Sequence, residues 1–184
     1  MKNFFRKVAF GIGPNEQAPS DPLKWALDQV NDVPELSWKG KIYSEKELRK
    51  HYRDWVYGDR KVLRKKYKDN KTLYKTHKDI LRHKTGQKFW ESLEISIRHN
   101  EGINSSSPVL AKLWMFWGNF FAISEKDFLA NYSTGAYQRE IIRPNLNQTF
   151  EKMVYDVTTS WAMIHHLDNS CLLYTSPSPR DRPL

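Results

Sequence analysis

The sequence lacks the residues that build disulfide frameworks, cysteine-based zinc clusters and membrane helices. It has one cysteine, Cys171, in 184 residues, which excludes a disulfide within one chain and a cysteine-based zinc cluster. The longest apolar run, 113–123, is about half of the roughly 20 residues that a membrane-spanning helix needs, and Gly118 and Asn119 interrupt it. Residues 1–7 show no apolar segment with a small-residue cleavage site. These absences predict no membrane span and no visible signal peptide, which by itself indicates a cytoplasmic protein.

Motifs of nucleotide-binding and hydrolytic enzymes are also missing. The sequence contains no phosphate-binding glycine loop, no dinucleotide glycine fingerprint, no Gly-x-Ser-x-Gly elbow and no His-Glu-x-x-His pair. His165 and His166 are adjacent, and successive helical residues diverge by about 100°, so the two imidazoles are not expected to bind one metal together. The sequence therefore predicts no metal site. It leaves the cofactor, the reaction and even whether the chain is an enzyme unknown.

What the sequence does contain is a strong excess of basic residues, concentrated in one segment. The chain has 30 Lys and Arg against 21 Asp and Glu, a formal charge of +9. Residues 39–88, the basic segment, hold 18 of these cations and 6 of the anions, and therefore carry the whole excess. The cations that we single out as candidate anion-binding residues are Lys61, Arg64, Lys65, Lys66 and Lys68.

Aromatic residues are interleaved with these cations, and two interpretations follow. A basic stretch with aromatics is typical of a surface that follows phosphates and stacks on bases, so one hypothesis is a scaffold or binding module with an anionic partner, such as nucleic acid, acidic polysaccharide or lipid headgroups. The other is a pair of helices with solvated lysine faces that serve only solubility. This second interpretation is favoured by a spacing close to 3.6 residues, which predicts that the side chains pack inward. The spacing is formed by Leu48, Tyr52, Trp55, Val62 and Leu63.

Helical patterns dominate the whole chain, and no stretch alternates like a β-strand. Helix ends are indicated by Gly11–Pro14, Asp21-Pro22, Ser44–Glu47, Asn70 and Ser107-Pro108. We expect the second basic helix to run from Asn70 without a break through Ile97, a loop at 102–107 and a break at Pro144. No internal repeat is present. The sequence therefore predicts an all-α fold, an irregular multi-helix domain.

Three polar or aromatic groups are further candidates for a site, each with a structural alternative. The aromatic stripe of Trp114, Trp117, Phe120 and Phe121 either forms core, which its helical period favours, or lines a ring-binding cleft. Arg139 and Arg143 either bind an acidic ligand or form ion pairs. The run 165–169, with two histidines, Asp168 and Asn169, either belongs to a site or caps the end of a helix.

Three blocks in the second half of the chain resemble a known bacterial family. These blocks are Leu113–Ser124, Tyr137–Pro144 and Ala162–Ser170. Their order and spacing are similar to those of the family catalogued as domain of unknown function 1800, and Phe10-Gly11 with Pro14 resembles its opening segment. The resemblance implies a mostly helical domain, often exported, with no established activity. It also implies one candidate partner, the product of a neighbouring gene for a second uncharacterised exported family.

The resemblance also points to candidate family-motif positions. These are Trp117, Asn119, Arg139, Arg143, Asp168 and Asn169. The chain departs from the family pattern where Phe120 replaces a histidine, where Gly118 stands at a second position that is often histidine, and where Trp161 replaces a proline. A metal or acid–base role of those histidines is therefore not carried over.

The end of the chain resembles something other than the family. The peptide Cys171–Asp181 is similar to the translation of a transposon-end adapter used in preparing sequencing libraries. We therefore expect residues 171–184 to be an adapter-derived tail, and residues 1–170 to be the N-terminal part of one helical domain, a truncated fragment. In the family an Asn-Glu-Asn-Tyr-Ala-Arg-Glu-like segment follows. One function hypothesis is an enzyme-like site where Arg143, Asp168 and Asn169 meet that segment.

Overall fold

The computed structural model describes residues 2–13, 16–124 and 130–167, and every regular element in these ranges is helical. The all-α prediction is confirmed. The elements are α1 (Lys2–Val8), α2 (Pro22–Val30), α3 (Glu45–Arg53), the π-helix η1 (Asp54–Asp59), α4 (Arg60–Lys66), α5 (Lys71–Lys84), α6 (Gln87–Asn104), α7 (Pro108–Phe120), α8 (Ala130–Tyr137), the π-helix η2 (Gln138–Ile142), the 3₁₀ turn η3 (Arg143–Asn145), α9 (Phe150–Thr159) and α10 (Trp161–His166). None of the described helices is long and apolar enough to span a bilayer.

Helix starts are fixed by the capping residues that the sequence indicates. Asp21 and Asn70 each accept the backbone N–H of the residue three positions on, at 3.0 Å. Ser44 and Glu47 form the expected capping box at the start of α3. After α1 the chain turns at Gly11, whose φ of 108° lies in the region that favours glycine. These interactions span only a few residues, which is why the sequence predicts them.

The helix expected from Asn70 to Ile97 is instead two helices. The N–H groups of both Thr85 and Gly86 donate to the carbonyl of Leu81 at 3.0 Å, and a Cβ at Gly86 would lie only 2.8 Å from the Cα of Arg82. This close approach requires glycine and ends α5, so the unbroken-helix prediction was wrong. The expected loop at 102–107 is also shorter, because α6 continues to Asn104.

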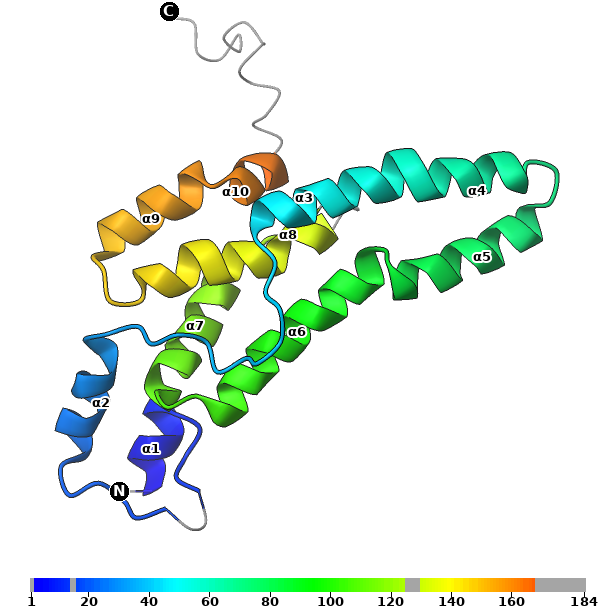
Figure 1. Ribbon diagram of the computed structural model, residues 1–184. Coiled ribbons are helices and arrows are strands. Elements are labelled where there is room, and N and C mark those ends of the chain that lie inside the picture. The colour runs from blue at the N-terminus through cyan, green and yellow to red at the C-terminus, as the bar shows by residue number, and fades with distance from the viewer. Residues whose placement is uncertain (1, 14–15, 125–129, 168–184) are drawn as a thin grey trace, which may run out of the picture.

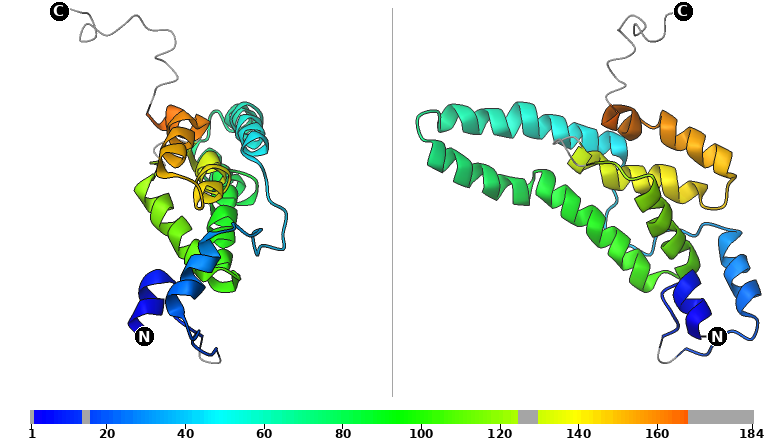
Figure 2. Two further views of the ribbon diagram at one scale, coloured as in Figure 1. Left: turned by 90° about the vertical axis from the view of Figure 1, so that its left-hand side faces the viewer. Right: turned by 180° about the vertical axis from the view of Figure 1, so that it is seen from behind.

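The helices form two regions, which we call the arm and the body (Figure 1). The arm, residues 45–84, contains α3, η1 and α4 in one rod and α5 returning beside it; the body is the rest of the described chain. The further views in Figure 2 show the same long projection from behind and end-on. At the far end of the arm, the Tyr67 and His77 rings lie 4.6 Å apart and join the two rods.

Apolar burial is strong at the base of the arm and weak along its length. Leu48 and Trp55 belong to a buried cluster with Trp90 and Tyr132 of the body. Farther out Leu63 is buried, whereas α5 has no buried residue. Inward packing is thus confirmed for Leu48, Trp55 and Leu63 of the predicted stripe. It is confirmed in part for Tyr52, which is half-buried. It was wrong for Val62, which is 63% exposed, because η1 has a longer hydrogen-bond period and shifts the phase of the stripe.

The body is organised around α7. Trp114 is 2% exposed and its indole N–H donates to the carbonyl of Gln138 at 2.8 Å. It packs with Tyr137, Ile142 and residues of α9 and α10 in one core cluster. The core prediction for the aromatic stripe is therefore confirmed for Trp114. Trp117 and Phe121 are half-buried and pack against this cluster. The core prediction was wrong for Phe120, which is 63% exposed at the last residue of α7.

Candidate functional site

Arg139 lies on η2 inside the body and forms a buried ion pair with Glu94 of α6. Its Nε and Nη2 atoms donate to the two carboxylate oxygens at 2.8 and 2.7 Å, and Nη2 also donates to the carbonyl of Tyr43 at 2.6 Å. The two side chains are 5% and 10% exposed. A bidentate pair of this kind is geometrically specific. It connects α6, η2 and the segment that precedes the arm.

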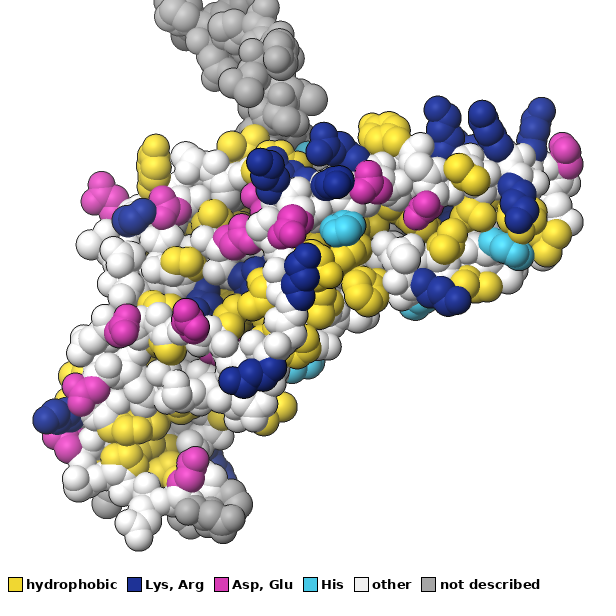
Figure 3. Space-filling model, viewed as in Figure 1, with side chains coloured by type: hydrophobic (Ala, Val, Ile, Leu, Met, Phe, Trp, Pro, Cys, Tyr) yellow, Lys and Arg dark blue, Asp and Glu magenta, His cyan; other side chains and the backbone are white. Residues whose placement is uncertain are grey.

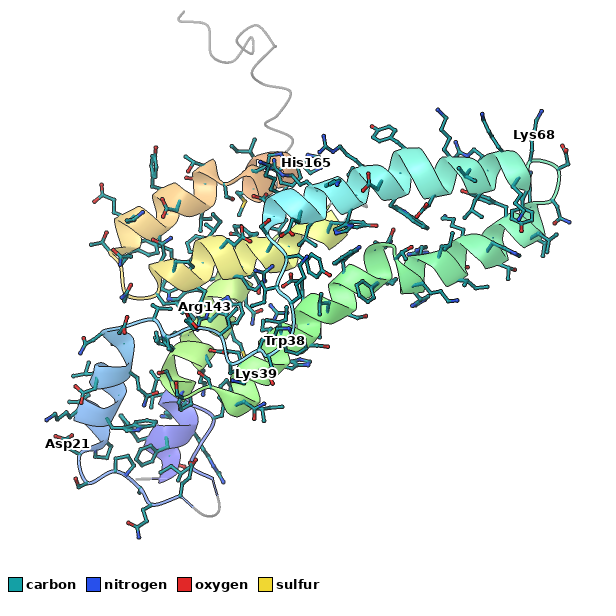
Figure 4. All side chains as sticks on the ribbon, in the orientation of Figure 1. Asp21, Trp38, Lys39, Lys68, Arg143 and His165 are labelled. Carbon is teal, nitrogen blue, oxygen red and sulfur yellow. The ribbon has the colours of Figure 1, made fainter. Side chains whose placement is uncertain are left out.

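Arg143 and Glu101 form a second buried pair nearby, and Figure 4 labels Arg143 within the body. The Nη2 of Arg143 donates to Glu101 at 3.1 Å and to the carbonyl of Pro34 at 2.6 Å. Glu101 also accepts hydrogen bonds from the Ser37 backbone and hydroxyl at 2.9 and 2.8 Å. Burial alone raises the pKa of Glu101, but the Ser37 hydrogen bonds and the Arg143 charge outweigh it and hold the pKa below its ordinary value. The carboxylate stays ionised at neutral pH.

Of the other candidate family-motif positions, the described ones, Trp117 and Asn119, do not join these two pairs. Trp117 is half-buried and stacks on Phe121 at 5.8 Å, and Asn119 is exposed near the end of α7. Asp168, Asn169 and the expected tail at 171–184 lie outside the described residues. Among Glu94, Arg98, Trp114 and Gln138 there is a small cavity of about 40 Å³, with room for only a few waters.

The histidines near the end of α10 have structural contacts. His166 Nδ1 accepts the Ser124 N–H at 3.2 Å, and the His165 ring stacks on Trp161 with 5.4 Å between centroids. Within the described ranges, no cluster of three or more His, Cys, Asp or Glu side chains is suited to a metal ion.

The arm presents its cations to solvent. The five predicted candidates, Lys61, Arg64, Lys65, Lys66 and Lys68, are all exposed. No carboxylate in the described part of the chain forms a salt bridge with any of them. Figure 3 shows dark-blue side chains gathered along the upper edge over α3 and α4, and Figure 4 places Lys68 at the far end of the arm.

Two shallow hollows lie along the arm and share one residue, Tyr57. The first has a volume of about 490 Å³ and is lined by Lys46, Arg49, Tyr52, Arg53, Tyr57 and Trp161. The second has a volume of about 320 Å³ and is lined by Val56, Tyr57, Arg60, Lys61 and Arg64. Because Tyr57 lines both hollows, they adjoin, and we call the two together the basic and aromatic track over α3, η1 and α4.

The electrostatics of the arm are those of a positive surface. Tyr74 of α5 lies beside the second hollow. Partial burial raises the pKa of Tyr74, but hydrogen bonds with Arg60 and Arg64 and the charge of Lys78 outweigh it and lower the pKa from its ordinary value. The direction of the shift indicates that a negative charge is stabilised at this position.

Sequence reasoning missed part of this track. Lys46, Arg49 and Arg53 recur every three or four residues on α3, and that spacing was a signal available in the sequence. Trp161 could not be found in this way, because α10 brings it from the other end of the described chain. Its ring lies 4.8 Å from the Arg49 guanidinium, a cation–π distance that joins α10 to α3.

Comparison with known proteins identifies a family and nothing more specific. The family described as "Protein of unknown function (DUF1800)" matches residues 3–171. The chain belongs to this family, and the resemblance in the three sequence blocks is confirmed. No curated protein and no solved structure matches the chain significantly.

Proposed function

We propose that this member of the DUF1800 family is a binding module whose arm holds an anionic partner. One observation carries the proposal: the five exposed cations of α4 and the arm tip have no salt-bridge partner in the described residues, whereas Arg139 and Arg143 each have a buried carboxylate. Clustered like charges repel one another and destabilise a compact fold. An anionic partner relieves that repulsion and releases the counterions that otherwise neutralise it.

The enzyme-like alternative has less support. It requires Arg143 to meet Asp168, Asn169 and a later family segment. The Arg143 guanidinium, however, already donates to Glu101 and Pro34 inside the body. A bound and buried guanidinium of this kind is typical of a structural ion pair. The cations of α4 and the arm tip are exposed, whereas Arg139 and Arg143 are held inside the body.

Direct binding of the full chain to polyanions tests the proposal. We would measure binding to fluorescent oligodeoxythymidylate, heparin and phosphatidylserine vesicles at about 50 and 200 mM salt. The test variant replaces four arm cations, Lys61, Lys65, Lys66 and Lys68, with Gln. The matched control removes the same charge outside the arm from four exposed cations that form no salt bridge in the described residues, through Arg6→Gln, Lys7→Gln, Lys24→Gln and Lys39→Gln.

We expect the control to bind like the wild type and the arm variant to lose most binding. For a single strand, four lost phosphate contacts reduce the slope of log affinity against log salt by about 3. Equal losses in the two variants would mean that only net charge matters. Affinity independent of salt would contradict the proposal.

A further inference from the structure

We infer that the anionic partner is a single-stranded nucleic acid that lies along the α3–η1–α4 track, with the Tyr57 ring stacking on a base. This inference rests on the proposed function and names the class of its partner. Tyr57 lines both hollows, so a chain-like ligand that occupies the two would pass the Tyr57 ring. The rod of residues 45–66 is about 30 Å long, a length suited to a ligand of several nucleotides.

The kind of cation changes across the arm. The hollows contain four arginines, Arg49, Arg53, Arg60 and Arg64, and two lysines. Toward the tip and along α5 the cations are mostly lysines, such as Lys65, Lys66, Lys68, Lys71 and Lys75; α5 also carries Arg82, which forms an ion pair with Asp79 at 3.5 Å. A guanidinium binds phosphate through two parallel hydrogen bonds and also stacks on planar rings, whereas an ammonium acts as a hydrated point charge. The arginine side is therefore suited to a ligand that has both phosphates and planar bases.

Tyr57 is an exposed aromatic ring at the centre of this track. Its side chain is 71% exposed, and no other aromatic ring of the described residues packs on it. Trp161, at one end of the first hollow, already contacts Arg49 and His165. The Tyr57 ring thus remains available to a ligand. Stacking of a base on an aromatic ring tolerates any sequence, because every base has a π-face.

Other anionic partners use these features less well. A membrane surface is bound by helices with several Trp, Phe or Leu side chains beside the charges, whereas on the arm Leu73 alone is an exposed residue of this kind, at 43%. An acidic polysaccharide has charge but no base to stack on Tyr57. In a duplex the base faces are covered by their neighbours in the stack. A single strand matches both the arginines and the exposed ring.

The test separates stacking from charge with two ligands of equal charge. We would compare an oligodeoxythymidylate of about 15 nucleotides with an abasic deoxyribose-phosphate strand of the same length, by fluorescence anisotropy. The variants are Tyr57→Ala, Tyr57→Phe and the control Tyr155→Ala. Tyr155 lies on α9, outside the arm, and is 67% exposed, so it matches Tyr57 in type and exposure. Circular dichroism shows whether each variant keeps its helices.

We expect the wild type to bind oligodeoxythymidylate at least about 5-fold more tightly than the abasic strand. Tyr57→Ala should weaken binding to the base-containing strand about 5- to 100-fold and leave the abasic strand unchanged. Tyr57→Phe should retain binding, because the ring remains. Tyr155→Ala should have no effect on either ligand.

Two outcomes overturn the inference while the proposed function stands. In the first, the wild type binds the base-containing and the abasic strand with equal affinity, and removal of the arm lysines abolishes binding to each strand. The other is tighter binding of heparin or phosphatidylserine vesicles that depends on the arm lysines but not on Tyr57. If no polyanion binds in an arm-dependent way, the proposed function itself fails.

Discussion

Arginines in the body and cations in the arm carry the same kind of charge in two different surroundings. In the body, Arg139 and Arg143 are removed from water, and each is bound to a carboxylate and to a backbone carbonyl. In the arm, Lys65, Lys66 and Lys68 are exposed to solvent on a rod that buries few apolar residues. The first set holds helices in place, and the second is the charge that the proposed anionic partner would contact.

The difference lies in desolvation rather than in residue type. A buried charge is costly unless its partner and hydrogen bonds are complete, so removing one member of a buried pair strands the other. An exposed charge keeps its water, and its removal leaves nothing unpaired. Substitutions in the body should therefore affect folding, and substitutions in the arm should affect binding.

The largest expected effect is loss of the buried pair at Arg139. Arg139→Ala leaves the Glu94 carboxylate buried without its partner and should lower the free energy of unfolding by about 3 to 5 kcal/mol. Lys65→Ala in the arm should change it by less than about 0.5 kcal/mol. Urea denaturation followed by circular dichroism measures both. Similar values for the two variants would remove the distinction between body and arm.

A matched pair of glycine substitutions sharpens the same comparison through packing. A Cβ at Gly135 of α8 would lie 2.3 Å from the Cβ of Glu94, so α6 and α8 would have to separate. Gly135→Ala should destabilise the protein by about 1 to 3 kcal/mol. Gly58 of the arm has nothing within 4 Å of the same position. Gly58→Ala should be neutral or stabilise by about 0.4 to 1 kcal/mol, and thermal unfolding of both variants tests this contrast.

Acid should weaken the body through Glu101. Its pKa is lowered in the folded protein, so its contribution to stability is complete above its ordinary pKa of 4.5 and is lost as the pH falls through the lower folded value. At pH 7, Glu101→Gln should cost about 1 to 3 kcal/mol. The Tm difference between wild type and variant should therefore shrink below pH 4.5. A Tm difference that stays constant as the pH falls below 4.5 would mean that the charge of the Glu101 carboxylate does not contribute to stability.

The smallest effect on folding is expected in the arm. The variant with Lys61, Lys65, Lys66 and Lys68 replaced by Gln should unfold within about 0.5 kcal/mol of the wild type. At low salt it should be slightly more stable, because repulsion within the arm is reduced. Denaturation at low and high salt measures both effects. Marked destabilisation would show that these lysines support the fold.

Local features could be predicted from the sequence, and long-range ones could not. Asp21, Ser44 and Asn70 cap helices through contacts three residues away, and the sequence alone places them. The partners of Arg139 and Arg143, in contrast, come from a helix more than forty residues earlier in the chain. The sequence could therefore not decide whether these arginines bind an acidic ligand or form ion pairs.

The errors in which helix residues were predicted to be buried have physical causes that a helical period cannot reveal. Val62 follows a π-helix that shifts the phase, and Phe120 stands at the end of α7 beyond the core. Gly86 ends α5 through a backbone approach that no side-chain pattern indicates. For the candidate site, the cations of the arm were found from charge density. The hollows and the contribution of Trp161 depend on how α10 packs.

The break at Gly86 has a consequence for the order in which the molecule opens. Beyond it, α4 and α5 contact each other across a short connection, so their contacts are between neighbours in sequence. α6, on the other side of the break, is tied to α8 by contacts between distant residues. Local contacts form and open quickly, and poorly buried segments unfold without the whole protein. Amide protons of α5 should therefore exchange with solvent well before those of α6.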